Sequence, residues 1–354
     1  MRTEVRFSSK RFLLALMLCA CSVILLLDDD LDRQTSFTFN LICLAVGLGI
    51  CFLLFLPSIL LKIRTDSDVP TLVRCCTPRL HLPVAIFYAM YFVYTAVFFL
   101  LPYTDMFHIK YFPDVTPCLI TTLMLLGCAY AASKGVNVIS RFGIFLFLFA
   151  LLTNFLMFGG SIAELDFRHY HFTPEGSAGG FLQNTLYFVT PAFIAAVYAC
   201  CSGTTRNFRF RQPLLALVFT GAKYAAVLFF IWFALGDYAM RQEYRTFVLS
   251  RVAHFGVFAG IESFYLALAT MSVFMIVSLF LCCMTRCAGS GGSWKSILLF
   301  TAIILALYVT ATYLPAVKEV LMQPALMLFF TFVAAAVVPF VYLFVGRKSN
   351  AKKA

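Results

Sequence analysis

The sequence predicts an all-α integral membrane protein that crosses the bilayer ten times. Of its 354 residues, 62% are hydrophobic and 12% are charged, an apolar excess that a water-soluble domain could not bury. A bilayer core about 30 Å thick requires about 20 apolar residues per helix. Ten stretches come within a few residues of that length: 11–27, 37–62, 82–102, 116–134, 141–160, 181–201, 213–235, 260–284, 294–315 and 323–346. We expect one membrane domain over residues 1–354.

The first stretch, 11–27, is the shortest, and basic residues precede it. Signal peptides share this pattern, but no cleavage site followed by a soluble domain is present, which favours a retained helix. Ten helices divide into two halves of five. Because five crossings invert one half relative to the other, we expect a 5+5 inverted repeat.

The basic residues between the stretches predict their orientation. The two ends of the chain and the even-numbered connections hold 19 of the 27 Lys and Arg residues, and the odd-numbered connections hold 7. Positive charge is retained on the inner side, so we expect both termini in the cytoplasm. This bias accounts for the net charge of +11 without a nucleic-acid partner. A basic inner face would also suit anionic lipid headgroups.

Two connections are expected to contain short helices. In the inner connection 62–81, Pro70 is suited to the first turn of an interfacial helix. In the outer connection 236–259, the apolar spacing of residues 243–258 predicts a helix lying on the outer surface.

Residues with catalytic or metal-binding chemistry form no recognisable site. The five histidines all fall in connections, and the pair His169 and His171 has no carboxylate at metal-ligand spacing. The 13 cysteines lack CxxC spacing and are interpreted as small buried apolar residues. No GxSxG, HExxH or phosphate-binding loop occurs. We therefore predict no catalytic residue, no metal site and no cofactor.

The sixth stretch contains polar residues and a proline near its centre. Pro191 removes a helical hydrogen bond, and Thr190 precedes it. In transporters with inverted repeats, the first helix of each half is broken at the midplane and forms the binding site. A plain proline kink, which membrane helices tolerate, is the alternative. The first stretch has no glycine or proline, although Cys19–Ser22 is a run of small residues.

Two charged residues lie inside or at the mouth of a stretch. Lys223 is ten residues past Pro213, about 15 Å along a helix. It could face the protein interior as a proton-linked or substrate-facing cation, or reach back to the inner surface. Glu262 opens the eighth stretch, where the helix dipole favours a carboxylate; a gating or cation-attracting role is the alternative.

Tyrosines follow one face of the third stretch, at Tyr88, Tyr91 and Tyr94. Such a face could line a small-molecule pocket, and packing is an equally good explanation.

The segment from Pro113 to Phe147 resembles one particular family. A Thr-Pro pair precedes the fourth helix, the sequence AYAASKG ends it, and ISR begins the fifth. The sequence DVPTLVR after the second helix fits the same pattern. Together they resemble the spore germination permeases, the B subunits of GerA-type nutrient receptors in the amino acid-polyamine-organocation transporter superfamily. The residues concerned are Asp114, Thr116, Pro117, Ala129, Tyr130, Ala131, Ala132, Gly135, Ile139, Arg141, Pro70, Thr71 and Leu72.

The resemblance implies a LeuT-like fold with a ligand site between helices one, three, six and eight. It implies a small nutrient ligand, an amino acid first, and a location in the inner membrane of a dormant spore. It also implies a membrane-anchored A subunit and a lipoprotein C subunit as partners. Placed on this sequence by fold alone, the pocket residues are Ala20, Cys21, Ser22, Tyr91, Tyr187, Phe188, Thr190 and Thr270.

Three functions compete at this point. The first is a receptor subunit, in which nutrient binding shifts a conformational equilibrium and triggers germination. The second is a proton-coupled amino-acid transporter, for which Lys223 is the deep titratable group. The third is a membrane enzyme such as an acyltransferase, which would use His169, His171 or His254, none of which has a convincing partner.

Overall fold

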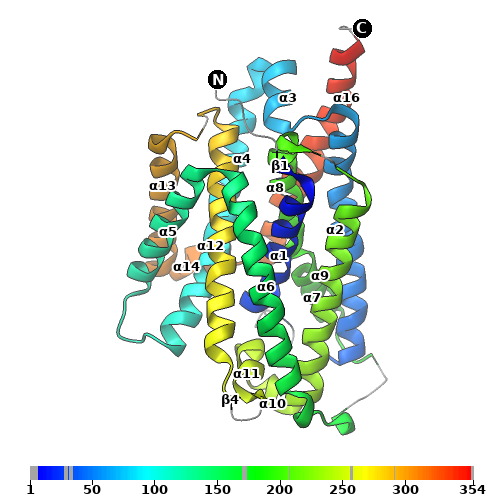
Figure 1. Ribbon diagram of the computed structural model, residues 1–354, viewed down its shortest axis with the longest axis vertical. Helices are drawn as coiled ribbons and strands as arrows, with labels where there is room; N and C mark the ends of the chain where they lie inside the picture. The colour runs from blue at the N-terminus through cyan, green and yellow to red at the C-terminus, as the bar shows by residue number, and fades with distance from the viewer. Residues whose placement is uncertain are drawn as a thin grey trace.

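The computed structural model describes residues 7–27, 31, 35–169, 174–206, 208–255, 258–290 and 292–351. Within these residues ten helices are long and apolar enough to cross a membrane, as predicted. They stand side by side as an elongated bundle (Figure 1). Short helices and turns close its two ends.

The ten spans follow the predicted stretches closely. Seven are single helices: α1 Ser9–Leu26, α2 Phe37–Thr65, α4 His81–Lys110, α5 Pro117–Lys134, α6 Val136–Gly160, α12 Glu262–Cys287 and α13 Trp294–Tyr313. The sixth span consists of α7 Ala178–Val189, the 3-10 turn η5 Thr190–Ala192 and α8 Phe193–Cys201. The seventh is α9 Arg211–Phe230 with the π-helical turn η7 Ile231–Leu235. The tenth is α15 Pro324–Phe332, the π-helical turn η8 Val333–Val337 and α16 Val338–Ala351.

Short elements occupy both ends of the bundle. One end, called the α3 face here, carries α3 Val69–Cys76, η2 Pro78–Leu80, η6 Ser202–Thr204 and the parallel strands β1 Phe7–Ser8 and β2 Thr205–Arg206 (Figure 1). The opposite end, called the α11 face, carries α10 Asp237–Met240, α11 Arg245–Val252, η3 Ile162–Glu164, η4 Phe167–His169 and the antiparallel strands β3 His254–Phe255 and β4 Phe258–Ala259. α14 Pro315–Leu321 links α13 to α15. The short helix predicted in the connection 62–81 is α3, and Pro70 lies in its first turn.

The third span is longer than the sequence indicated. The stretch 82–102 ends at Pro102, but α4 continues through this proline to Lys110. Proline removes one backbone donor and leaves earlier carbonyls without their usual partner. The hydroxyl of Thr104 donates to the carbonyls of Leu100 and Leu101, at 2.8 and 3.0 Å.

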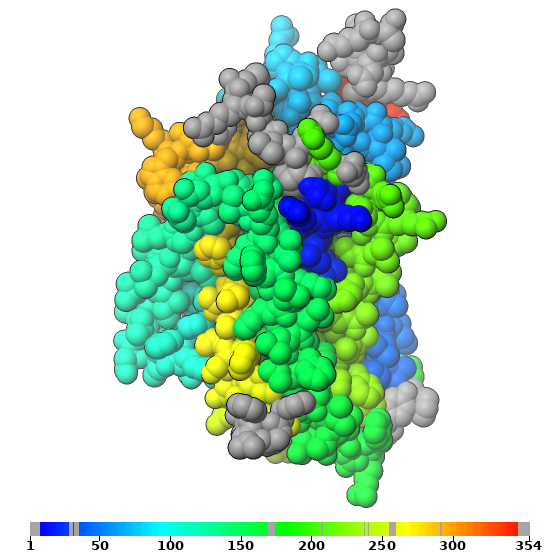
Figure 2. All heavy atoms as spheres, viewed as in Figure 1, coloured from blue at the N-terminus to red at the C-terminus, as the bar shows by residue number. Residues whose placement is uncertain are grey.

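The first span lies in the middle of the bundle. α1 packs against α6, α9 and α12, and its residues from Phe12 to Leu26 are buried apart from Leu14. From the side seen in Figure 2, α1 is visible only near the α3 face, because α6 and its neighbours cover the rest.

α11 corrects the expectation of a helix on the outer surface. Residues Arg245–Ser250 are buried. The segment lies beyond the end of α1, which stops inside the bundle at Leu26 (Figure 1). The hydroxyl of Thr246 donates to the carbonyl of Ile24 at 3.5 Å, and that of Tyr265 to Leu25 at 2.5 Å. The apolar spacing of this segment therefore serves protein packing, and α11 closes the space that the short α1 leaves.

All 13 cysteines are free thiols, and ten of them are buried. Two pairs of thiols lie between α8 and α12: the Sγ atoms of Cys200 and Cys287 are 3.7 Å apart, and those of Cys201 and Cys283 are 3.6 Å apart. Within the described ranges, no group of three or more His, Cys, Asp or Glu side chains is arranged to hold a metal ion.

Candidate functional site

The sixth span is interrupted where the sequence predicted. The α-helix ends at Val189, and the 3-10 turn Thr190–Ala192 connects it to the helix that begins at Phe193. Proline cannot supply a backbone N–H group, so one α-helical hydrogen bond is lost at Pro191. The interruption is buried, with Thr190 6% exposed. It places backbone groups with irregular bonding near the middle of the bundle.

Four spans are buried far more than the other six. The buried share of the most apolar window is 89% for the sixth span, 83% for the first, 72% for the eighth and 67% for the third. No other described span exceeds 50%. Spans one, three, six and eight thus form the centre of the bundle. These are the spans that the family resemblance placed around a ligand.

The first span is a continuous helix, and side chains of α9 bind its backbone. The hydroxyl of Tyr224 donates to the carbonyl of Ala20 at 2.8 Å, and the Nζ atom of Lys223 donates to that of Cys21 at 3.2 Å. Ser22 donates within the helix, to Leu18 at 2.6 Å. The structure therefore brings Ala20 and Cys21 together with Lys223.

This contact also shows where Lys223 points. Its ammonium reaches the backbone of the central helix, as the interior interpretation of this residue expected. Glu262 begins α12 at the α11 face, and its carboxylate lies 3.8 Å from the guanidinium of Arg251. That position agrees with a carboxylate at the mouth of the eighth span.

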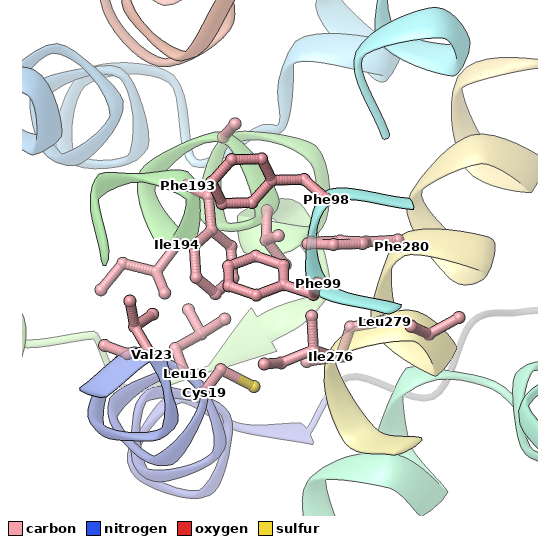
Figure 3. Close-up of a cluster of buried hydrophobic side chains, with 14 of the residues drawn as sticks. Leu16, Cys19, Val23, Phe98, Phe99, Phe193, Ile194, Ile276, Leu279 and Phe280 are labelled. Carbon is pink, nitrogen blue, oxygen red and sulfur yellow. The ribbon is translucent and has the colours of Figure 1, made fainter. Parts of the chain in front are cut away.

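The junction of the four central spans is filled by apolar side chains. Figure 3 shows residues of α1, α4, α8 and α12 converging there. The ring centroids of Phe99 and Phe193 are 5.0 Å apart, and those of Phe193 and Phe280 are 5.6 Å apart. Cys19 of α1 closes the cluster from the other side, fully buried.

A cavity of about 380 Å³ that opens to the surface lies beside this junction, between α4, α7 and the start of α15, and five of its ten lining residues are exposed. Its volume falls within the range of small-molecule sites. Thr190 and Tyr187, both predicted as site residues, line it together with Phe98, Gln183 and Gln323. The remaining lining residues are Gly179, Leu182, Leu186, Pro324 and Ala325.

The other predicted site residues lie elsewhere. The hydroxyl of Tyr91 is 3.2 Å from that of Thr331 on α15. Thr270 accepts a hydrogen bond from Tyr103 at 3.2 Å. The backbone of Phe188 packs directly on Gly47, where an added Cβ atom would lie 2.6 Å from the Cβ atom of Phe188. None of these three, and no residue of α1, is among the described residues that line the cavity.

Two residues of the cavity carried a usable sequence signal. Gln183 is a polar residue within the broken span, and Gln323 is the first residue of the predicted tenth stretch, 323–346. Neither signal indicated that the two side chains share a cavity, because the tenth span was not expected at the site. Phe98 is one of 41 phenylalanines and has no distinguishing pattern.

The α3 face is closed by a buried ion pair. The side chain of Asp68 is 1% exposed, and its carboxylate lies 2.6 Å from the guanidinium of Arg286, the last charged residue of α12. Asp68 also accepts from the N–H of Thr71 and caps α3. Arg286 donates to the carbonyl of Cys200 at 3.2 Å, and Arg74 donates to the carbonyl of Arg286 at 2.5 Å.

A second buried cation strengthens this closure. Lys62, at the end of α2, donates to the carboxylate of Asp66 at 2.6 Å and to the carbonyl of Thr205 at 3.2 Å. Thr205 in turn pairs with Phe7 in the two parallel strands. These contacts hold together the ends of α2, α3, α8 and α12, so the bundle is closed on the α3 face and hollowed beside α7.

The comparison with protein families agrees with this architecture. A family model described as spore germination protein, of the spore permease type, matches residues 5–314. The match covers most of the chain and nine of its ten spans.

The chain belongs to the spore germination permease family. This family consists of transporter- or receptor-like membrane proteins. The ten apolar helices and the family together make this a multi-pass membrane protein. A comparison with curated proteins gave no match.

Proposed function

We propose that this protein is the B-type subunit of a spore germinant receptor, which binds a small nutrient in a transporter-like fold and triggers germination. We expect this nutrient to be an amino acid. The fold would be LeuT-like, with a 5+5 inverted repeat and the α3 face in the cytoplasm. The receptor would lie in the inner membrane of the spore with A and C subunits as partners.

The interruption of the sixth span at Thr190 and Pro191 carries this proposal. Broken helices at the centre of a membrane bundle are the usual binding elements of transporter folds. The burial of spans one, three, six and eight supports the same arrangement. A receptor needs a ligand that favours one of two conformations. In this protein the α3 face is closed and the cavity lies near the opposite end, and a rearrangement between these two ends would supply the second conformation.

The proposal is tested in spores that carry Thr190→Trp or Ala20→Trp. The indole of Thr190→Trp would lie at the broken helix, and that of Ala20→Trp would lie in the central helix α1. We therefore expect at least a tenfold higher nutrient concentration for half-maximal germination in either strain. Thr310→Trp is the matched control, because Thr310 lies on the exposed side of α13. Immunoblots of spore membranes must show equal protein in all three strains. Unchanged dose–response curves for both central variants would contradict the proposal.

Proton-coupled amino-acid transport is the second candidate. The observation in its favour is Lys223, an ammonium inside the seventh span that binds the backbone of α1. Ionisable residues at such depth commonly belong to ion or proton pathways. Robust uptake of labelled amino acids into proteoliposomes, abolished by Lys223→Met, would favour the transporter over the receptor.

A further inference from the structure

The N-terminal ends of two neighbouring spans meet at the α3 face. α1 begins at Ser9 and α9 begins at Arg211, and the two helices pack against each other. The strand β1 directly precedes α1, and β2 lies shortly before α9; in this pair Ser8 is opposite Arg206. Figure 2 shows the exposed start of α1 at this end, beside the segment that contains β2. Two stretches that are far apart in the sequence are thereby joined at one level of the bundle.

Neither helix start has an acidic partner. The first N–H groups of a helix lack partners within it and carry partial positive charge. The residues before the two helices, Ser8 and Phe210, make no side-chain cap, and neither first turn contains an acidic residue. The hydroxyl of Ser9 and the amide of Gln212 are buried and have no hydrogen-bond partner among the described residues. Both helix starts therefore lack the accepting group that usually caps such an end.

Five exposed cations lie in these helix starts or just before them: Lys10, Arg11, Arg206, Arg209 and Arg211. The ion pairs that the described residues form include none of the five. The acidic residues described on this face already have partners. Asp66 pairs with Lys62 at 2.6 Å, and the buried Asp68 is held by the last arginine of α12. The positive charge beside α1 and α9 is therefore not balanced by the described part of the protein.

This combination of groups suits a phosphate. Helix N-termini bind phosphate through their backbone N–H groups, and guanidinium groups bind its oxygens bidentately. The two helix starts are also the ends of two membrane spans, so they lie at the level of the lipid headgroups. Phe210 lies among the arginines and is 44% exposed, which suits the boundary between headgroups and acyl chains.

We propose that the starts of α1 and α9 form a binding site for the phosphate of an anionic phospholipid. α1 is buried from Phe12 onward apart from Leu14, so its start is the part of this central helix that a lipid can reach. α9 holds the α1 backbone through Lys223 and Tyr224. A headgroup that bridges the two starts would reinforce the same pair of helices. Such a site requires only a bundle that spans the membrane, so it is independent of the receptor function.

The test compares two lipids of similar size and different charge on the purified protein in mixed micelles. Dioleoyl phosphatidylglycerol has a net negative charge, and dioleoyl phosphatidylcholine has none. Binding is measured as the lipid-dependent rise in unfolding temperature, which increases with the ratio of ligand concentration to Kd. Each cation near an anionic lipid contributes about fivefold in affinity, so with several cations we expect a preference of about tenfold or more for phosphatidylglycerol.

Two paired variants remove the cations from one side of the site at a time. Arg209→Gln with Arg211→Gln alters the start of α9, and Lys10→Gln with Arg11→Gln alters the start of α1. Each pair should reduce the preference for phosphatidylglycerol about tenfold. Because both pairs contact one headgroup, the variant that combines them should lose less than the product of the two separate effects.

The matched control removes two cations from the same face at another place. Lys134 and Arg141 are exposed on either side of the turn between α5 and α6 (Figure 1). Lys134→Gln with Arg141→Gln changes the net charge by the same amount, and its preference should stay within about twofold of the unaltered protein, because surface charges act over about a Debye length.

Three results would overturn the proposal. One is no preference for phosphatidylglycerol in the unaltered protein. Another is a loss in the control as large as in the paired variants, which would indicate general attraction to a basic face. The third is equal stabilisation by inorganic phosphate without lipid, which would indicate a soluble anion.

A photoreactive phosphatidylglycerol tests the unaltered protein directly, and it decides the question if size-exclusion profiles show that a variant does not fold. Crosslinks to the peptides that contain Lys10 or Arg209 would support the site. Crosslinks confined to other peptides would overturn it.

Discussion

Breaking the buried ion pair at the α3 face should be among the most destabilising changes in the protein. Arg286→Met removes the partner of a carboxylate whose side chain is only 1% exposed. Removing one member of a buried pair typically costs 3–5 kcal/mol, because the remaining charge is left without compensation. Arg286 is itself 17% exposed and Asp68 keeps its bond to the N–H of Thr71, so we expect about 3 kcal/mol, the lower end.

The protein contains a matched control for this change. Arg251 and Glu262 form an ion pair near the α11 face at 3.8 Å, with side-chain exposures of 72% and 35%. Exposed pairs of this kind contribute about 0.2–1 kcal/mol. Arg251→Met should therefore have a small effect, although it removes the same side chain and adds the same one.

Equilibrium unfolding of the purified protein in mixed micelles measures both variants. Asp68→Asn and the double variant complete a double-mutant cycle, which separates the pair from other contacts of Arg286. A cost below about 1 kcal/mol for Arg286→Met, or one equal to that of Arg251→Met, would refute the argument that burial makes this pair important.

Three further changes have definite expected results. Gly47→Ala should cost about 1–3 kcal/mol in unfolding free energy, because its Cβ would meet Phe188 at 2.6 Å. Gly49→Ala is the control and should be nearly neutral, because no atom lies within 4 Å of the added Cβ. Equal effects would be inconsistent with the close packing of α2 on α7. Pro191→Ala restores a backbone donor at the interruption and should raise the unfolding temperature while weakening the germination response; a full response would show that the break is dispensable. Tyr265→Phe removes the hydroxyl that binds α1 and should cost about 1–3 kcal/mol in the same unfolding assay. An unchanged unfolding free energy would show that this hydrogen bond does not hold α1 in place.

The spans were predictable because their signal is local. Each requires only a run of apolar residues, and the proline of the sixth span marks its own interruption. Pro102 shows the limit of local reasoning, since the same residue type lies inside a continuous α4. A proline alone therefore does not determine whether a span is interrupted.

The site was harder to predict because it depends on pairs that are far apart in the chain. Asp68 and Arg286 are separated by 218 positions, and each looks like an ordinary inner-loop charge. Gln183 and Gln323 are 140 positions apart in the chain. α11 was misplaced for a related reason: an apolar face suits a membrane surface and a protein interior equally well. α1 ends at Leu26, inside the bundle, and α11 fills the space beyond this end.

The capping of α1 by α11 bears on how the protein is made. The carbonyl of Ile24 receives its side-chain donor from a residue 222 positions later. At a synthesis rate of about 5–20 residues per second, the first helix waits on the order of 10–45 s for that partner. During this interval α1 must remain in the membrane beside helices that do not yet complete its surroundings. Assembly of the centre can therefore finish only late in translation, after the seventh span has entered the bilayer.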